Sequence, residues 1–189
     1  MDKNLTRHPL LLEKGNVALV VIDMQEKFKP VIPEFDKLVK NVKTLVQCFQ
    51  MWKLPVLVTE QYPQGLGETV KELKDCFHII EISEKTTFSC VQNDHFNVSL
   101  NRLNVNRLVV CGIESHVCVH QTVHDLLHRH YNVWVVRDAI GSRDPQNAEV
   151  GFQRMVGAGA LPTSTEMLLF EMAFEAGSEG FKELQKLVK

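Results

Sequence analysis

Residues 107–128 read RLVVCGIESHVCVHQTVHDLLH, and this stretch decides the fold. The apolar run at 107–111 predicts a buried strand, and the residues from 115 to 130 have the apolar spacing of a helix. Ser115 is a residue type that caps helix N-termini, so only residues 112–114 are expected to separate the strand from the helix. A strand that passes directly into a helix is the repeating unit of α/β proteins.

The same alternation of apolar runs and helical patterns extends in both directions from this stretch. Strands are expected at residues 17–22, 55–59, 79–82, 107–111 and 133–136, with a short sixth strand opening at Leu161. Helices are expected at 36–53, 92–103, 115–130, 147–158, 164–173 and 181–188. This order predicts an α/β fold whose central, mostly parallel sheet of about six strands is covered on both faces. No repeat or linker divides the chain, so residues 1–189 are expected to form a single domain.

Composition and charge exclude several classes of partner. The chain of 189 residues is 44% hydrophobic and 23% charged, with a formal net charge of -2. These values are ordinary for a soluble globular protein, and no basic run is interleaved with aromatic residues, so no nucleic-acid partner is expected. No apolar run is long enough to span a bilayer, so no membrane partner is expected either. Residues 1–15 lack the apolar segment of a signal peptide.

Five cysteines, Cys48, Cys76, Cys90, Cys111 and Cys118, occur at irregular spacing without a CxxC pair. Such a pattern indicates reduced thiols and favours a cytoplasmic location, with a mitochondrial one left open. Four of them are expected to be small core hydrophobes. Cys118 differs because it falls in the first turn of the helix at 115–130. The positive end of the helix dipole favours a thiolate there, and free N–H groups can hold an oxyanion; a buried structural thiol is the alternative.

Two further residues follow predicted strands. Asp23 ends the strand at 17–22, where apolar walls would make a carboxylate more basic and suit it to accept protons; the alternative is a loop-capping role. Lys85 follows the strand at 79–82, where a lysine is ordinarily solvated but could stabilise a thiolate and a carboxylate. Ligands of parallel sheets bind at the carboxyl ends of the strands, so function is expected here.

Five motifs carry a family resemblance. In chain order they are VVIDMQEKF (20–28), VTEQYPQGLG (58–67), EKTTFS (84–89), GIESHVCV (112–119) and VVRDAIGSR (135–143). With them the chain resembles the isochorismatase-like cysteine hydrolases from residue 17 onward, and most closely the eukaryotic isochorismatase-domain-containing proteins. GIESHVCV after a strand is the most specific element. The resemblance implies a three-layer Rossmann-like fold and a homo-oligomer, either a dimer or a tetramer.

The resemblance also implies roles for individual residues. Cys118 resembles the nucleophile, Asp23 the general base and Lys85 the third member of the catalytic triad. A non-proline cis peptide bond is expected between Ile113 and Glu114, and it would turn the Glu114 N–H toward the Cys118 N–H to form an oxyanion hole. Four residues match pocket-lining, substrate-binding positions of the family: Gln25, Phe28, Tyr62 and Ile113.

We therefore expect an enzyme that hydrolyses a C–N bond of a small amide or ureide through a cysteine thioester. No metal or other cofactor is expected, because Glu60-Gln61-Tyr62 stands where metal-binding relatives carry Asp-x-His. Two alternatives stay open: hydrolysis of an isochorismate-like vinyl ether, and a catalytically quiet domain that acts through protein partners. The intact set of Asp23, Lys85 and Cys118 speaks against the second of these.

Four histidines lie four residues apart on the helix at 115–130: His116, His120, His124 and His128. Successive residues at this spacing form a slowly turning ridge on one side of a helix. A polar, exposed or subunit-facing ridge is expected, since no acidic or cysteine ligand has matching spacing; in a metal-binding alternative, His120 and His124 would be the pair. Asp138 and Arg143 are expected to stabilise a loop.

Overall fold

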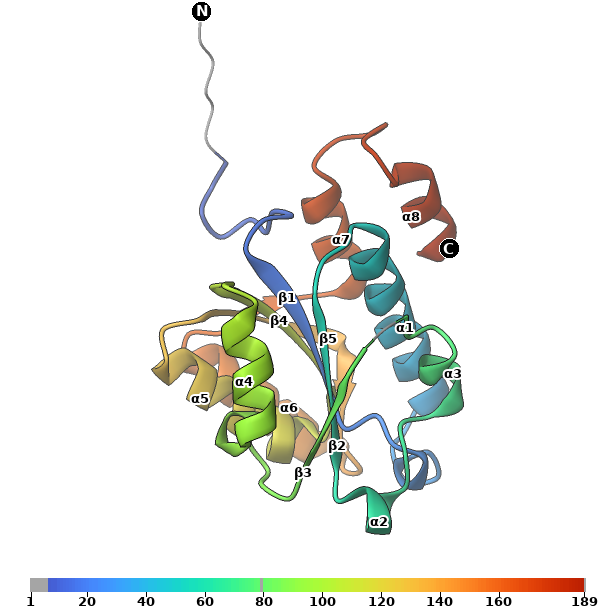
Figure 1. Cartoon of the computed structure of the whole chain (residues 1–189), viewed down its shortest axis with the longest axis vertical. Coiled ribbons are helices and arrows are strands. Elements are labelled where there is room, and N and C mark those ends of the chain that lie inside the picture. Colours follow the sequence, from blue (N-terminus) through green and yellow to red (C-terminus); the bar gives the residue numbers. More distant parts are fainter. Residues whose placement is uncertain (1–6, 79, 189) are drawn as a thin grey trace, which may run out of the picture.

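The computed structural model describes residues 7–78 and 80–188 and shows one parallel sheet between two layers of helices. The strands are β1 (Val17–Ile22), β2 (Val56–Gln61), β3 (Ile82–Lys85), β4 (Arg107–Ile113), β5 (Asn132–Gly141) and β6 (Leu161–Thr163). They pair in the order β3-β2-β1-β4-β5-β6, and every pairing is parallel (Figure 1). The expected three-layer α/β architecture with six strands is therefore confirmed.

Apolar side chains of the two sheet faces form two cores. One face packs against α1 (Phe35–Met51), α3 (Lys71–Lys74), α7 (Thr165–Ala173) and α8 (Phe181–Leu187). The other packs against α4 (Asp94–Arg102), α5 (His120–His128) and α6 (Pro145–Gly157). Because both faces are covered, strands such as β1 are buried at every residue, which explains their uninterrupted apolar sequences. Among the described residues, no helix is long and apolar enough to cross a membrane.

The strand order places a switch point between β1 and β4. From β1 the chain adds β2 and β3 on one side, and then β4, β5 and β6 on the other. In open parallel sheets, such a reversal leaves a crevice at the carboxyl ends of the two central strands. Asp23 follows β1 there, and the turn that contains Cys118 follows β4.

The predicted third strand is wrong in position. The sequence placed it at 79–82, whereas β3 runs over Ile82–Lys85; Ile79 lies outside the described residues. The apolar pair at 79–80 suggested a continuous buried run. In the structure β3 instead alternates, with Ser83 and Lys85 buried and Glu84 exposed, as an edge strand does. The correction matters because Lys85 is the last residue of the strand rather than a loop residue beyond it.

The predicted helix at 115–130 also begins differently. Residues Ser115–Val119 form a π-helical turn, and α5 continues from His120 to His128. Some short elements were not predicted from the sequence. They are the helix α2 (Pro63–Leu66) and the 3₁₀ turns Glu26–Phe28 and Cys90–Gln92. π-Helical turns occur often at functional sites, because they change the direction in which side chains project.

Gly112 allows β1 and β4 to approach each other where their carboxyl ends meet. Its φ is +115°, and a Cβ at this position would lie 2.1 Å from the carbonyl oxygen of Ile22. Only glycine fits a positive φ against a backbone atom at this distance. The close approach sets the spacing between Asp23, which follows Ile22, and the turn that follows β4.

We predict that Gly112→Ala destabilises the protein by about 3 kcal/mol or more, because backbone strain adds to a clash with another backbone. Urea unfolding monitored by circular dichroism measures this change. Gly157→Ala is the matched control, since nothing lies within 4 Å of a Cβ there and alanine favours helices. Equal stability of the two variants would contradict the prediction.

Candidate active site

Three side chains that the sequence singled out lie together at the carboxyl edge of the sheet. Asp23 follows β1, Lys85 ends β3, and Cys118 lies in the π-helical turn after β4. They are 1%, 3% and 6% exposed, respectively. Strand pairing explains the convergence: Ile22 is in register with Thr59 of β2, and Gln61 of β2 is in register with Lys85.

Lys85 and Asp23 form a buried ion pair. Lys85 Nζ lies 2.7 Å from Asp23 Oδ2. The ammonium also lies 2.6 Å from Gln61 Oε1, 3.3 Å from the Thr87 carbonyl oxygen and 3.2 Å from that of Phe88. Burial is the largest single cause and lowers the pKa of Lys85, but the charge of Asp23, the neighbouring Cys90 and Cys118 and the hydrogen bond to Asp23 together outweigh it, so the pKa is raised and the side chain is a cation.

The Cys118 thiol faces this pair in its protonated form. Burial is the largest cause that raises its pKa, and the charge of Asp23 together with a side-chain hydrogen bond to it adds to the rise; Lys85 opposes it. The expectation that the helix start favours a thiolate is therefore wrong for the resting protein. The helix-end field is weak compared with the removal of the thiol from water and the adjacent carboxylate. Cys118 Sγ lies 4.0 Å from Gln61 Oε1.

The turn before Cys118 presents backbone N–H groups near the thiol. The Ile113–Glu114 peptide bond is cis. The Glu114 carbonyl accepts the N–H groups of Val117 and Val119, but not that of Cys118 between them. Backbone N–H groups beside a nucleophile are the donors from which oxyanion holes are built.

The side chain of Glu114 has a structural role. Its Oε1 accepts from the Arg143 backbone N–H and Nε, each at 3.0 Å. Asp138 Oδ1 likewise accepts from the backbone N–H and the hydroxyl of Thr165, at the start of α7. Arg143 and Asp138 thus hold loops together, as the sequence suggested.

The four expected pocket residues lie in different environments. Gln25 is buried, and its amide is occupied: Nε2 donates to the carbonyls of Gln61 and Gly67, and Oε1 accepts from the Gln61 N–H. Both N–H groups of the amide are used, so Gln25 holds the loop after β2 and has no donor left for a substrate. Ile113 is fully buried in the core, and Phe28 packs against that core half-buried. Tyr62 is 54% exposed and accessible to a ligand.

With the site described, the chain can be compared with known proteins. It matches the isochorismatase domain over residues 17–167. The chain belongs to the isochorismatase family. Isochorismatase domain-containing protein 2 of Danio rerio, a family member, is 36% identical over 179 residues, which cover 94% of this chain and 89% of that protein.

Two solved structures are also similar to this member of the isochorismatase family. The MAR1 ribonuclease of Caenorhabditis elegans is 38% identical with a TM-score of 0.89, covering 94% of this chain and 91% of that one. The YcaC gene product of Escherichia coli, described as an octameric hydrolase of unknown specificity, is 23% identical with a TM-score of 0.89, covering 96% and 92%. At this identity, YcaC shows only that the fold is shared. The match to the isochorismatase domain and the similarity to the Danio rerio protein confirm the family resemblance predicted from the motifs.

Sequence reasoning missed two polar residues of this isochorismatase-family site. Thr59 and Gln61 belong to β2 and are buried beside Asp23 and Lys85. Threonine and glutamine near the end of an apolar strand are a weak signal of function. The signal was their position in VTEQ, directly before the loop, since strand ends of neighbouring parallel strands meet at one edge.

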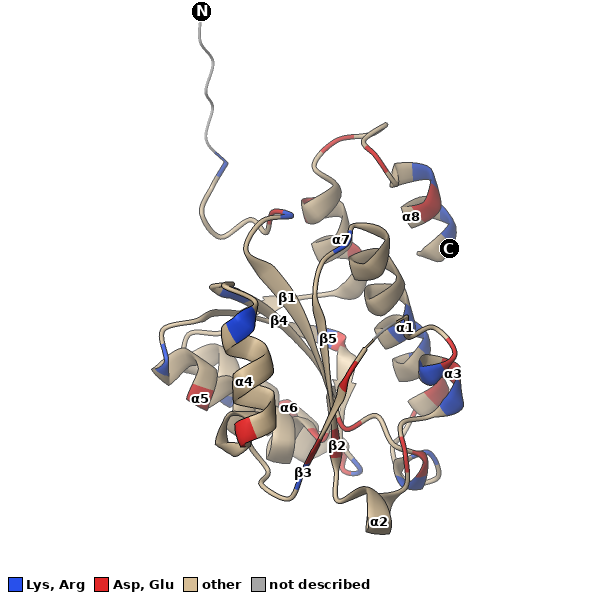
Figure 2. Cartoon of the chain, in the orientation of Figure 1, with Lys and Arg blue, Asp and Glu red and all other residues tan. Residues whose placement is uncertain are grey.

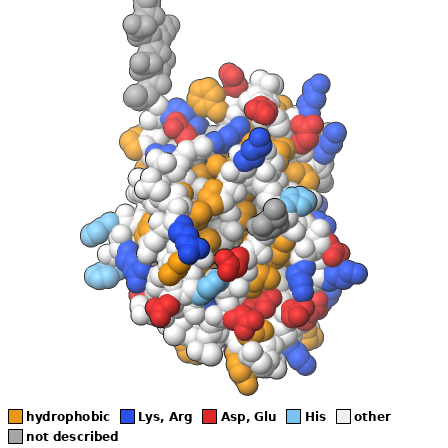
Figure 3. Space-filling view, in the orientation of Figure 1, with side chains coloured by type: hydrophobic (Ala, Val, Ile, Leu, Met, Phe, Trp, Pro, Cys, Tyr) orange, Lys and Arg blue, Asp and Glu red, His pale blue; other side chains and the backbone are white. Residues whose placement is uncertain are grey.

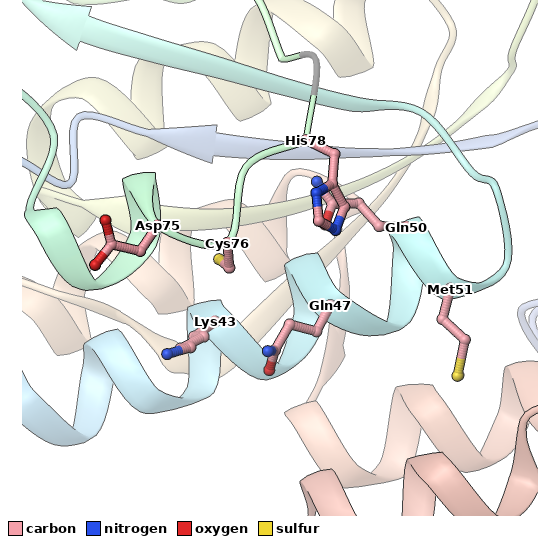
Figure 4. Close-up of a pocket in the computed structure, with 7 residues that line it drawn as sticks. All are labelled: Lys43, Gln47, Gln50, Met51, Asp75, Cys76 and His78. Carbon is pink, nitrogen blue, oxygen red and sulfur yellow. The ribbon is translucent and has the colours of Figure 1, made fainter.

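One cavity of the structure lies away from the catalytic edge. It measures about 460 Å³ and lies between α1 and the segment after α3; Figure 4 shows its lining residues, among them Lys43 and Gln47 of α1 and Asp75 and Cys76 of the other segment. None of its lining residues is Asp23, Lys85 or Cys118. A cleft of about 270 Å³ at Tyr62, Glu84 and Lys85 is the cavity that borders the catalytic residues. Chemistry rather than size identifies the candidate active site.

The histidine ridge forms a partly exposed flank of α5. His116 Nδ1 lies 2.9 Å from Ser142 Oγ, and the rings of His120 and His124 are 4.2 Å apart between centroids. Histidine side chains are exposed at the edge of the molecule where α5 lies (Figure 3). Within residues 7–78 and 80–188, no group of three or more His, Cys, Asp or Glu side chains is arranged to hold a metal ion.

His120 makes stability depend on pH. Burial is the main cause that lowers its pKa, and His124 and Arg154 add to it, so the pKa falls from 6.5 to about 4. The unfolded chain therefore binds this proton first as pH falls, and stability declines between pH 6.5 and about 4. Because His120 is partly exposed, we expect a loss of about 1–2 kcal/mol rather than the full shift.

The His120→Gln variant should reduce this acid-induced loss, measured as the difference between urea-unfolding free energies at pH 7 and pH 4. His128→Gln, at an exposed position of the same helix, is the matched control and should retain the wild-type slope. An unchanged slope in the His120 variant would show that another group is responsible.

Proposed function

We propose that this protein is a metal-independent cysteine hydrolase that cleaves the C–N bond of a small amide or ureide. The observation that supports this most directly is the buried arrangement of one thiol, one carboxylate and one ammonium: Cys118 faces Asp23, and Asp23 is paired with Lys85 at 2.7 Å. A neutral thiol beside an ionised carboxylate is a nucleophile paired with its own base.

The reaction begins with proton transfer from the Cys118 thiol to Asp23. The sulfur attacks the amide carbonyl carbon, and the N–H groups of Glu114 and Cys118 bind the oxyanion that forms. Protonated Asp23 then gives its proton to the leaving nitrogen, so the C–N bond breaks and a thioester remains. Water, deprotonated by Asp23, attacks the thioester and releases the acid with the thiol restored. Lys85 stays charged and offsets the negative charge of each intermediate.

The residues at the end of β2 support a mechanism without a metal ion. Glu60 Oε1 accepts the N–H and the hydroxyl of Thr69 at 2.6 and 2.7 Å, and Gln61 is bonded to Lys85. Their oxygen atoms therefore hold protein groups in place.

A second candidate is hydrolysis of an isochorismate-like vinyl ether, which the family name favours. A quiet, protein-binding role is the third, and a ribonuclease activity is raised by the name of the C. elegans relative. On both α3 and α8 a Glu stands between two Lys residues, so neither helix forms a continuous basic face for RNA (Figure 2).

The test is an ammonia-release screen over small carboxamides and ureides, with a vinyl ether and an RNA oligonucleotide as additional substrates. We expect one or more amides to be hydrolysed and Cys118→Ala to lower kcat by about 1000-fold or more. Cys48→Ala, a buried cysteine of α1 outside the site, is the matched control and should retain activity. Amide hydrolysis that survives in Cys118→Ala would exclude the thioester mechanism.

We further propose a single hydrolase domain that assembles as a homo-oligomer in the cytoplasm. The octameric state described for YcaC supports the oligomer, and five free thiols support a reducing compartment. Light scattering of the purified protein measures the subunit number, and a monomer at micromolar concentration would contradict the proposal.

A further inference from the structure

Thr59 contacts Asp23 through both its backbone and its side chain. The Thr59 carbonyl accepts the Asp23 N–H at 3.1 Å, and the Thr59 hydroxyl lies 2.7 Å from Asp23 Oδ1. Asp23 has a φ of +53°, a left-handed conformation in which a residue with a Cβ needs local contacts to stay. Thr59 is fully buried, so water does not compete for either contact.

The direction of the hydrogen bond follows from the groups involved. An ionised carboxylate paired with Lys85 has no proton to give, so the Thr59 hydroxyl donates to Asp23 Oδ1. The lone pairs of the hydroxyl then point toward Cys90, whose Sγ lies 3.7 Å from Thr59 Oγ1. With the Cys90 thiol on one side and the Asp23 carboxylate on the other, the Thr59 hydroxyl accepts from the thiol and donates to the carboxylate.

The two oxygens of Asp23 are thereby distinguished. Oδ1 accepts a hydrogen bond from Thr59 and Oδ2 accepts one from Lys85, each at 2.7 Å. Within the described residues, these two side chains are the oxygen and nitrogen donors to the carboxylate. Bonds from opposite sides fix the plane of the carboxylate. The titratable groups around Asp23 are Lys85 from β3, Cys118 from the π-helical turn and Cys90 from the 3₁₀ turn after β3.

We propose that Thr59 is a positioning residue that holds Asp23 ionised and aimed at Cys118, and so sets the pH below which the thiol loses its base. The inference rests on the proposed function, in which Asp23 accepts the Cys118 proton. It concerns a residue that touches neither the substrate nor the thiol. Loss of the hydroxyl removes a hydrogen bond to a buried charge, which favours the protonated acid.

The experiment follows the pH dependence of Cys118 alkylation by iodoacetamide, measured by mass spectrometry of the Cys118 peptide. The other four cysteine peptides serve as internal references. Because the readout is the thiol itself, no substrate is required. Wild type should show an acid limb set by Asp23, and Asp23→Asn should lose that limb, so that labelling rises only at higher pH as the thiol itself ionises.

The variants are isosteric Thr59→Val and hydroxyl-retaining Thr59→Ser. The half-point of the acid limb should move up by about one to two pH units in Thr59→Val, from the strength of a hydrogen bond to a charge, and return toward wild type in Thr59→Ser. Thr44→Val is the matched control, since Thr44 is a buried threonine of α1 whose hydroxyl bonds the Lys40 carbonyl. Thermal unfolding confirms that each variant is folded.

The outcomes separate the two proposals. A shifted limb in Thr59→Val with recovery in Thr59→Ser supports the positioning role, which a purely structural threonine would not produce. An unmoved limb in Thr59→Val, with the limb absent in Asp23→Asn, overturns the role of Thr59 and leaves the proposed mechanism in place. An acid limb that persists at the wild-type pH in Asp23→Asn overturns both proposals, because Asp23 is then not the base. If Thr59→Val does not fold, an acid limb that moves up in Thr59→Ser overturns the inference.

Discussion

The buried ion pair between Asp23 and Lys85 is the interaction on which the site depends. The side chains are 1% and 0% exposed, so both charges have been taken out of water at a cost of several kcal/mol each. Their mutual attraction offsets this only when further hydrogen bonds satisfy the remaining donors and acceptors. Gln61, Thr59 and the carbonyls of Thr87 and Phe88 supply those bonds. The ends of β1, β2 and β3 are therefore tied to one another by charge.

The same pair explains the state of the nucleophile. Burial and the Asp23 carboxylate raise the pKa of Cys118, so the thiol is protonated until it reacts. Such a site differs from one that holds a permanent thiolate beside an unpaired cation, because the positive charge of Lys85 is already balanced by Asp23. Proton transfer to Asp23 during attack leaves the ammonium free to stabilise the sulfur and the oxyanion. Because Lys85 is paired with Asp23, Cys118 is activated by proton transfer to Asp23 and not by being a permanent thiolate.

A second set of buried polar contacts keeps the loop after β2 in place. Gln25 bonds to Gln61 and Gly67, and Glu60 bonds to Thr69, so residues on both sides of the loop are attached to the sheet edge. This loop carries Tyr62, whose exposed ring borders the cleft beside Lys85. Buried polar groups must be hydrogen-bonded, and the partners of the Gln25 amide lie at the two ends of this loop. Gln25, which matches a pocket position of the family, therefore acts by holding the loop in shape.

The layered α/β fold, the parallel sheet and the position of Cys118 between a strand and a helix could all be predicted from the sequence. These follow from local patterns: continuous β-branched runs, helical apolar spacing and a polar residue at the turn. Their places after predicted strands drew attention to Asp23 and Lys85, and the family motifs supplied the catalytic roles predicted for them. Tertiary structure alone decided that β3 is shifted to Ile82–Lys85, that Thr59 and Gln61 complete the charge network, and that the Cys118 thiol is protonated. The reason is that burial and hydrogen bonds join residues such as Asp23 and Lys85, which lie 62 positions apart, and no local pattern reports their distance.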